Sequence, residues 1–267
     1  VIFFSIFFGF CLSLMGDSVR MVTDFFQKVG DVMIRMTNYV MLYAPIGVFG
    51  LIAYTVTRHG LAVLLPLGKL ILTAFIATLI FVCITYLPII KLIGMKISDY
   101  LKGAFEPWLI AFTTCSSAAA LAVNLEASRK MGASKAIASF AIPLGNTINM
   151  NGTSIYMGVT AVFAAEVFGI DLTLAQQFQI VLMGVLAAVG TAGVPGAGLI
   201  MTTLVFTEVG IPLEAVALIA GIDRILDMIR TSVNVLGDSL TALVVSKSEG
   251  VLGTELMDQD TVVKEQL

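Results

Sequence analysis

The stretch GIDRILDMIRTSVNVLGDSL, residues 221–240, carries six polar or charged side chains that share one helical face in an otherwise apolar sequence. With about 100° of rotation per residue in an α-helix, all six lie within an arc roughly 100° wide. They are Asp223, Asp227, Arg230, Thr231, Asn234 and Asp238. Charged groups at membrane depth cost roughly 2.5–3.5 kcal/mol each on insertion scales, so they mostly face a polar cavity and have a function there. The stretch therefore predicts a membrane helix with a binding site for a charged solute or an ion.

The composition of the whole chain supports this interpretation. Hydrophobic residues make up 58% of the chain and charged residues 12%, against about 25% charged in ordinary soluble domains. Residues 136–165 and 172–207 contain no charged side chain. Several such stretches exceed what one soluble core hides, so we expect an all-α integral membrane protein embedded in the lipid bilayer. The net charge of −3 and the lack of a basic face exclude nucleic acid as an expected partner.

The cysteines and the single histidine form no pattern typical of disulfides or metal sites. Cys11, Cys83 and Cys115 are odd in number and scattered, and His59 has no cysteine or second histidine near it. We interpret the cysteines as small apolar residues. Residues 1–15 are short for a membrane span and lack the basic start of a signal peptide, so we expect an N-terminally truncated chain.

Four apolar segments are long enough to cross a membrane: 21–57, 62–90, 136–165 and 214–245. The first begins amphipathically and becomes apolar, which is typical of a long tilted helix that emerges from the membrane surface. The third is interrupted by GNTINMNGT.

Two further segments contain short apolar pieces around a polar or glycine-rich centre. Segment 103–131 has TTCSSAAA (113–120) at its centre, and segment 172–207 has GTAGVPGAG (190–198). Broken helices at membrane depth are tolerated only where protein or a cavity satisfies the backbone, so we expect two re-entrant helical hairpins in inverted repeats. Each hairpin precedes a span, and interrupted segments in two corresponding halves point to a transporter binding site.

The charges of the loops favour the hairpins over crossing segments. Loops 91–106 and 126–135 are rich in lysine and arginine, whereas 166–171 and 208–214 carry only acidic charges. Because basic loops favour the cytoplasm, only two hairpins that return to their own side place both basic loops inside. This topology predicts a multi-pass protein of the cell membrane with a cytoplasmic C-terminus.

The polar face of 214–245 has a simpler explanation as well as a functional one. Asp227 and Arg230 are spaced to form an ion pair that merely locks helices together. Such a pair is often no better than an apolar one for stability, and it would leave the other polar residues without a role. The planar guanidinium of Arg230 suits a carboxylate, and Asp227 suits an ammonium group, so together they predict an acidic amino acid as ligand.

The sequence allows two other functions, an intramembrane hydrolase and a channel. An intramembrane hydrolase could use Asp223 and Asp227, but a pair of catalytic carboxylates normally faces each other from separate elements, and these two stand on one helix. A channel remains open on the sequence alone.

The stretch GNTINMNGTSIY (145–156) offers oxygen ligands for Na⁺, because a broken helix exposes carbonyl oxygens and asparagines add more. Its small residues could also serve only as a kink or a close-packing face. The centres of the two hairpins are either tight turns or gates whose helix N-termini face an anionic ligand.

These motifs resemble the dicarboxylate/amino acid:cation symporter family, which includes glutamate and aspartate transporters. The resemblance covers essentially residues 1–250. It rests on YAPIGVF (43–49), the Ser-containing centre of the first hairpin, NMNGT (149–153), GTAGVPGAG (190–198) and the D-x-x-R-T-x-x-N-V-x-G-D pattern at 227–238.

The resemblance implies a homotrimer in which a transport domain slides past a scaffold like an elevator. Residues 1–60 would be part of the scaffold and its trimer contacts, 61–250 the transport domain, and 251–267 a cytoplasmic tail.

The resemblance also implies the roles of single residues. Arg230, Thr153 and the Gly198 backbone would hold the side-chain carboxylate of the substrate. Asp227 and Thr231, with the carbonyls of Cys115 and Val194, would hold its amine. Asn234 and the Ser117 backbone would hold its α-carboxylate.

Sodium would be the co-transported ion, and no organic cofactor is expected. The resemblance implies one sodium site at Gly145, Asn149, Asn234 and Asp238, and another at Thr147 and the carbonyls of Ala188, Val189 and Thr191. Asn151 stands where many relatives have aspartate, which removes a negative charge and leaves no firm expectation of a third sodium.

Within the family, C4-dicarboxylate carriers tend to lack the aspartate at 227, and carriers of neutral amino acids tend to lack the arginine at 230. The resemblance thus implies Na⁺-coupled uptake of L-aspartate or L-glutamate, with a proton-coupled or C4-dicarboxylate carrier as the alternatives.

Overall fold

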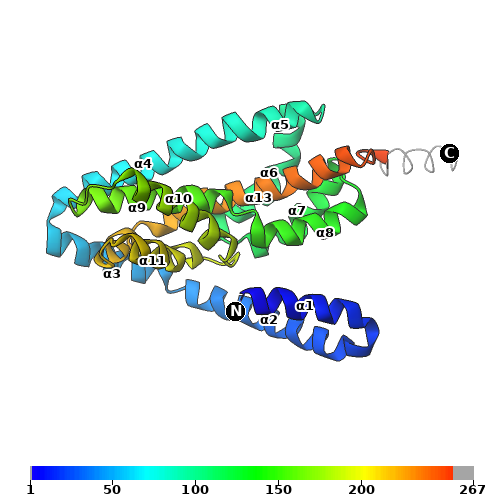
Figure 1. The fold of residues 1–267 in the computed structure, drawn as a ribbon, viewed down its shortest axis with the longest axis horizontal. Helices are drawn as coiled ribbons and strands as arrows, with labels where there is room; N and C mark the ends of the chain where they lie inside the picture. The colour runs from blue at the N-terminus through cyan, green and yellow to red at the C-terminus, as the bar shows by residue number, and fades with distance from the viewer. Residues whose placement is uncertain (1, 255–267) are drawn as a thin grey trace. The chain divides into compact units, whose positions relative to one another are not determined.

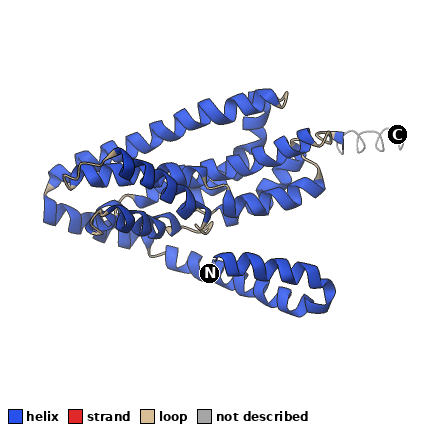
Figure 2. Ribbon diagram, in the orientation of Figure 1, coloured by secondary structure: helices blue, strands red, loops and turns tan. Residues whose placement is uncertain are grey.

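The computed structural model describes residues 2–254, and all regular structure in this part of the chain is helical (Figure 2). The chain divides into two compact units, Val1–Gly47 and Val48–Leu267. Most of the predicted tail, 251–267, lies outside the described residues.

The first unit is built around a pair of helices, α1 (Ile2–Met15) and α2 (Arg20–Met41), joined by a short 3-10 turn (Figure 1). The rings of Phe8 and Phe26 meet edge to face, with centroids 5.5 Å apart. The expected long helix over 21–57 is wrong. The chain breaks after Met41, and α3 begins at Ala44 (Ala44–His59), because Pro45 has no backbone N–H to donate to the Met41 carbonyl and suits the first turn of a new helix.

The second unit contains the span predicted at 62–90. Leu61–Leu92 is the one helix in the described residues that is long and apolar enough to cross a membrane. It consists of a short 3-10 turn, α4 (Leu64–Phe81), a π-helical stretch (Val82–Tyr86) and α5 (Leu87–Leu92). Most of its apolar surface is exposed, as expected of a helix in contact with lipid or a further protein segment.

Two helix–turn–helix pairs occupy the segments predicted as hairpins. In the first, α6 (Ile97–Thr114) packs against α7 (Ser117–Lys130). Their turn, Cys115–Ser116, lies inside the predicted centre at 113–120.

In the second pair, α10 (Leu174–Val189) packs against α11 (Ala197–Val209). Gly196 takes a positive φ of 77° just before α11, a backbone conformation that glycine adopts without the cost of a Cβ. The break therefore coincides with GTAGVPGAG, as predicted.

The apolar segments that follow the two pairs are both broken. Residues 136–165 form α8 (Lys135–Ile148) and α9 (Asn151–Val167), interrupted at Asn149 as expected.

The prediction of one continuous helix over 214–245 is wrong, because α12 (Glu214–Ala220) ends before α13 (Asp223–Ser248) begins. Gly221 has low helix propensity, and Asp223 suits the first turn of a new helix. A Cβ at residue 221 would lie 3.2 Å from Cγ1 of Ile52, so α3 approaches this break closely.

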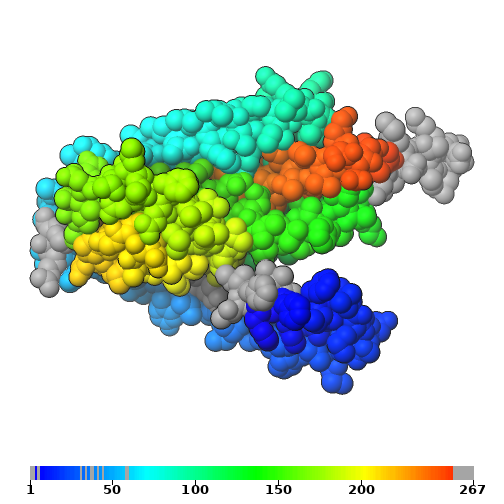
Figure 3. Space-filling model, in the orientation of Figure 1, coloured from blue at the N-terminus to red at the C-terminus, as the bar shows by residue number. Residues whose placement is uncertain are grey.

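Helix α13 runs through the middle of the second unit, where it packs against α4, α6, α7, α8 and α9 (Figure 1). Its middle is buried, and its C-terminal part reaches the surface between α4–α5 and α7–α8 (Figure 3). The helix that carries the polar face is thus the core of this unit, with apolar clusters around Phe206 and Leu226 and around Tyr100 and Leu243.

Candidate functional site

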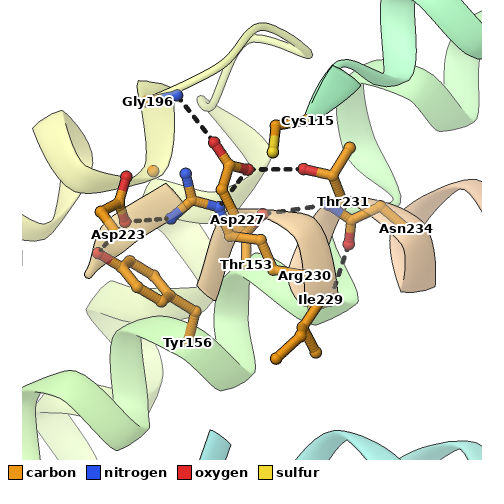
Figure 4. A network of polar contacts seen from close by, with 12 residues as sticks. Cys115, Thr153, Tyr156, Gly196, Asp223, Asp227, Ile229, Arg230, Thr231 and Asn234 are labelled. Atoms are coloured by element: carbon orange, nitrogen blue, oxygen red, sulfur yellow. Dashed lines mark hydrogen bonds and ion pairs between the residues drawn. The ribbon is translucent and has the colours of Figure 1, made fainter. Parts of the chain in front are cut away.

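Arg230 is at the centre of a buried polar network on α13 (Figure 4). Its Nε donates to Oδ1 of Asp227 at 3.0 Å, and its Nη1 donates to Oδ1 of Asp223 at 3.2 Å. The side chains are 3–6% exposed at residue level. Helical spacing explains the arrangement, since residues three and seven positions apart lie on one face. The ion pair that the i,i+3 spacing permits is therefore formed, and a second carboxylate, Asp223, joins it.

Tyr156 on α9 completes the surroundings of Arg230. Its hydroxyl donates to Oδ1 of Asp223 at 2.9 Å, and the guanidinium carbon lies 4.4 Å from the centre of its ring. A guanidinium over an aromatic face is attracted by the ring quadrupole. Tyr156 ends the GNTINMNGTSIY stretch and was not predicted as a site residue. Its position three residues after Thr153, on the same helical face, is the signal that could have identified it.

Asp227 joins α13 to the turn between α10 and α11. Its Oδ1 accepts from the Thr231 hydroxyl at 2.7 Å, and its Oδ2 accepts from the Gly196 backbone N–H at 2.9 Å. The second helix–turn–helix pair is therefore held to the central helix through the carboxylate predicted to bind an amine.

A narrow cavity lies beside this network, and its free space admits about one water molecule. Eight of the nine residues predicted to contact the substrate line it: Ser117, Thr153, Val194, Gly198, Asp227, Arg230, Thr231 and Asn234. The ninth, Cys115, is not among the lining residues. Met150, Thr191, Ala192 and Gly193 also line it and were not predicted as substrate contacts. The structure thus brings these eight residues together, from four separate elements and the turn between α10 and α11, around a narrow cavity.

Two donors in this cavity have no partner within the described residues. The Ser117 hydroxyl is buried and unpaired. Nη2 of Arg230 makes no hydrogen bond, whereas Nε and Nη1 are engaged by carboxylates. Buried donors are rarely left unsatisfied, so the Ser117 hydroxyl favours an anionic or polar ligand in the cavity. Nη2 of Arg230 is engaged by neither carboxylate and could bind the same ligand.

The residues of the first predicted sodium site also lie together. Asn149 donates from Nδ2 to Oδ1 of Asp238 at 2.8 Å and to the Asn234 carbonyl at 3.3 Å. A Cβ at residue 145 would lie 2.6 Å from Oδ1 of Asp238, so only glycine fits there. Asp238 is 2% exposed and has this one side-chain partner, which leaves carboxylate oxygen available to a cation.

Asn234 contributes to both the candidate substrate site and the candidate sodium site. Its side chain faces the cavity, where Oδ1 accepts from the Gly152 N–H at 2.8 Å and Nδ2 donates to the Thr153 hydroxyl at 3.1 Å. Its carbonyl points instead toward Asn149. One residue therefore links the candidate substrate and ion sites.

The side-chain amide of Asn151 donates hydrogen bonds to two neutral groups. Its Nδ2 donates to Oδ1 of Asn149 at 2.6 Å and to the Tyr86 hydroxyl at 3.1 Å. An aspartate here would have no N–H to offer these two oxygens.

The hydroxyls of the two threonines in the second predicted sodium site bond to nearby carbonyls. The Thr147 hydroxyl donates to the Leu144 carbonyl at 2.7 Å, and the Thr191 hydroxyl donates to the Ala187 carbonyl at 2.9 Å. Each hydroxyl thus bonds within or next to its own helix, and the site at Thr147, Ala188, Val189 and Thr191 stays a prediction.

Comparison with known proteins defines the class to which this fold and site belong. The model of the Sodium:dicarboxylate symporter family matches residues 1–248. The chain belongs to this family, which consists of membrane transporters and not of enzymes, so the hydrolase hypothesis is wrong.

Individual relatives are similar over nearly the whole chain. It is 39% identical over 255 residues to the proton/sodium-glutamate symport protein of Geobacillus stearothermophilus, covering 96% of this chain and 61% of that protein. It is 39% identical to the proton/glutamate-aspartate symporter of Escherichia coli K12, over 93% of this chain and 57% of the relative. It is also 39% identical to the C4-dicarboxylate transport protein of Bacillus subtilis 168, over 93% of this chain and 59% of the relative. The chain spans about three fifths of the length of these relatives.

Proposed function

We propose that this chain forms the substrate-binding part of a Na⁺-coupled symporter of acidic amino acids, L-aspartate or L-glutamate. The observation that carries the proposal is the buried cavity in which Arg230 keeps an unpaired Nη2 beside Asp227. Relatives described as glutamate and glutamate-aspartate symporters support the substrate class.

The chemistry of the cavity suits a zwitterion with an extra carboxylate. The free Nη2 of Arg230 would bind the side-chain carboxylate of the substrate, with Thr153 and the Gly198 backbone. Asp227 and Thr231, with the carbonyls of Cys115 and Val194, would hold its ammonium group. Ser117 and Asn234 would bind the α-carboxylate, and the unpaired Ser117 hydroxyl adds a donor to the predicted backbone N–H.

The cavity has room for about one water molecule, so it must expand to admit an amino acid. The lining includes Ser117 next to the first turn and Gly193 and Val194 in the second, so displacement of either turn would open it. We propose that both helix–turn–helix pairs are re-entrant hairpins that act as gates, within a transport domain at 61–250.

Coupling to Na⁺ would act through Asn234. A cation held by Gly145, Asn149, Asp238 and the Asn234 carbonyl would reorganise the hydrogen bonds of Asn149 and fix Asn234 for the substrate. We further propose the homotrimer with residues 1–60 in its scaffold, elevator-type movement, and a multi-pass topology in the cell membrane with a cytoplasmic C-terminus.

A C4-dicarboxylate carrier is the second candidate, because one relative carries that description. Asp227 argues against it: the carboxylate would face a second anionic group of the substrate, where an ammonium would be attracted. Proton coupling, named for two relatives, is the alternative to Na⁺.

Calorimetric titration of the purified complete transporter tests these choices. We expect L-aspartate to bind in NaCl and at least tenfold more weakly in choline chloride, and succinate to bind weakly in both. Equal affinity for aspartate in the two salts would overturn Na⁺ coupling, and tighter binding of succinate would overturn the amino-acid assignment.

Arg230→Cys is expected to lower the affinity for L-aspartate at least about 100-fold, because it leaves buried carboxylates without their partner. Binding of a neutral amino acid such as L-serine should persist. Lys130→Gln, at the far end of α7, is the control and should leave binding unchanged. Unaltered aspartate affinity in Arg230→Cys would refute the role of the guanidinium.

A further inference from the structure

Arg224 connects the start of α13 to the end of α6. Its Nη2 donates to the Thr113 carbonyl at 2.9 Å, and its Nη1 lies 3.4 Å from the Thr114 carbonyl, across 110 positions in sequence. The last carbonyls of a helix lack intrahelical partners and carry the negative end of the helix dipole, so a guanidinium is a suitable cap. Neither the predicted ligand sites nor the proposed mechanism uses this residue.

The turn that Arg224 reaches is conformationally strained. Cys115 has φ 56° and ψ 33°, in the left-handed region, and is the one residue other than glycine with positive φ in the described chain. This region costs about 1–2 kcal/mol for a residue with a Cβ, so surrounding contacts must hold it. The Cys115 thiol also points to the Arg224 carbonyl at 3.8 Å.

The other side of the turn is held by the second helix–turn–helix pair. The Gly193 carbonyl accepts from the Ser116 hydroxyl at 2.9 Å and from the Ala118 N–H at 3.2 Å. The α6–α7 turn is therefore fixed between Arg224 and Gly193, and Ser117, the next residue, lines the ligand cavity.

The first turn of α13 thus acts on the cavity in two ways. Asp223 accepts a hydrogen bond from Arg230, which lines the cavity, and the neighbouring Arg224 donates to the last carbonyls of α6 at the α6–α7 turn. We propose that Arg224 is a positioning residue that keeps the α6–α7 turn closed over the cavity, so that release of its two carbonyl contacts is the step that frees this turn. Its consequence for transport rests on the proposed function, but the restraint itself does not.

Cys115 reports directly on this restraint, because it is 1% exposed and lies in the turn. We would measure the rate of maleimide labelling of Cys115 in the purified protein after replacing Cys11 and Cys83 by serine. In this background Arg224→Gln is expected to raise the rate at least about tenfold, since it removes charge-assisted hydrogen bonds. Arg224→Lys keeps the charge without the fork and should give an intermediate rate, and Lys130→Gln should match the parent.

A rate in Arg224→Gln within twofold of the parent, with an unchanged melting temperature, would overturn the inference. If Arg224→Gln does not fold, Arg224→Lys decides: a rate about threefold above the parent supports the restraint, and the parental rate overturns it. Labelling in NaCl with L-aspartate separates the two proposals. Faster labelling of the variant without protection by aspartate would leave the restraint standing and count against the proposed function.

Discussion

Arg230 has room for its guanidinium because residue 198 is glycine. A Cβ at this position would lie 2.5 Å from Cζ and 2.6 Å from Nη1 of Arg230, closer than real side chains approach. The same closeness occurs at Gly152, where a Cβ would meet the backbone of Arg230. Helices α9 and α11 therefore approach the backbone and the guanidinium of Arg230 closely at these two glycines.

Gly198→Ala tests this packing. The added methyl group should push the guanidinium away from Asp223 and Asp227 and lower the affinity for L-aspartate about 10-fold or more in calorimetric titration. Gly158→Ala is the matched control, since its Cβ would meet open space within α9 and alanine favours the helix. Parental affinity in Gly198→Ala would show that Arg230 does not depend on this gap.

At the scale of the elements, the N-cap residues of α7 and α8 allow the effect of a cap on stability to be distinguished from its effect on ligand binding. Ser116 and Ser134 each accept from the backbone N–H three residues further on, at 3.2 Å and 3.3 Å. Only Ser116 also donates to the Gly193 carbonyl and so joins the two turns at the cavity. Two similar caps therefore differ in their connection to the site.

Ser116→Ala and Ser134→Ala should each lower the free energy of unfolding by about 1 kcal/mol, the usual cost of losing an N-cap. Only Ser116→Ala should also weaken L-aspartate binding, because it releases the α6–α7 turn from Gly193. Denaturant unfolding and calorimetry on both variants measure the two effects. Equal loss of affinity in the two variants would contradict a specific role of the Ser116 link.

At the scale of the whole molecule, the proposed substrate and ion sites share Asn234. Binding at one should therefore assist binding at the other, and thermodynamic coupling of this kind is reciprocal. Each ligand binds only the folded protein, so binding also raises the stability of the folded protein. A ligand concentration of 100 times the dissociation constant adds about 2.7 kcal/mol to the free energy of unfolding.

We expect NaCl and L-aspartate together to raise the melting temperature by more than the sum of their separate effects. Choline chloride at the same concentration is the control for ionic strength. A rise with aspartate that is as large in choline as in sodium would argue that Asn234 does not couple the two sites.

Sequence periodicity predicted much of the fold, and the motifs of the family resemblance predicted the residues of the site. Polar residues at helical spacing defined the face of α13, and the small polar centres at 113–120 and 190–198 predicted both breaks. The set around the cavity was predicted from motifs, and all of its members except Cys115 line the cavity. The misplaced boundaries, at Pro45 and Gly221, fall where a single proline or glycine ends a helix within an apolar run, which hydrophobicity does not reveal.

The sequence by itself determined which residues share a face, because that depends only on the 3.6-residue turn of a helix. Tertiary structure alone decided which atoms meet across elements: Tyr156 under Arg230, Arg224 on the carbonyls of Thr113 and Thr114, and Asn234 divided between two sites. These contacts join residues far apart in the chain, and they depend on how the helices pack and where glycines let backbones approach. The local sequence pattern does not predict that packing.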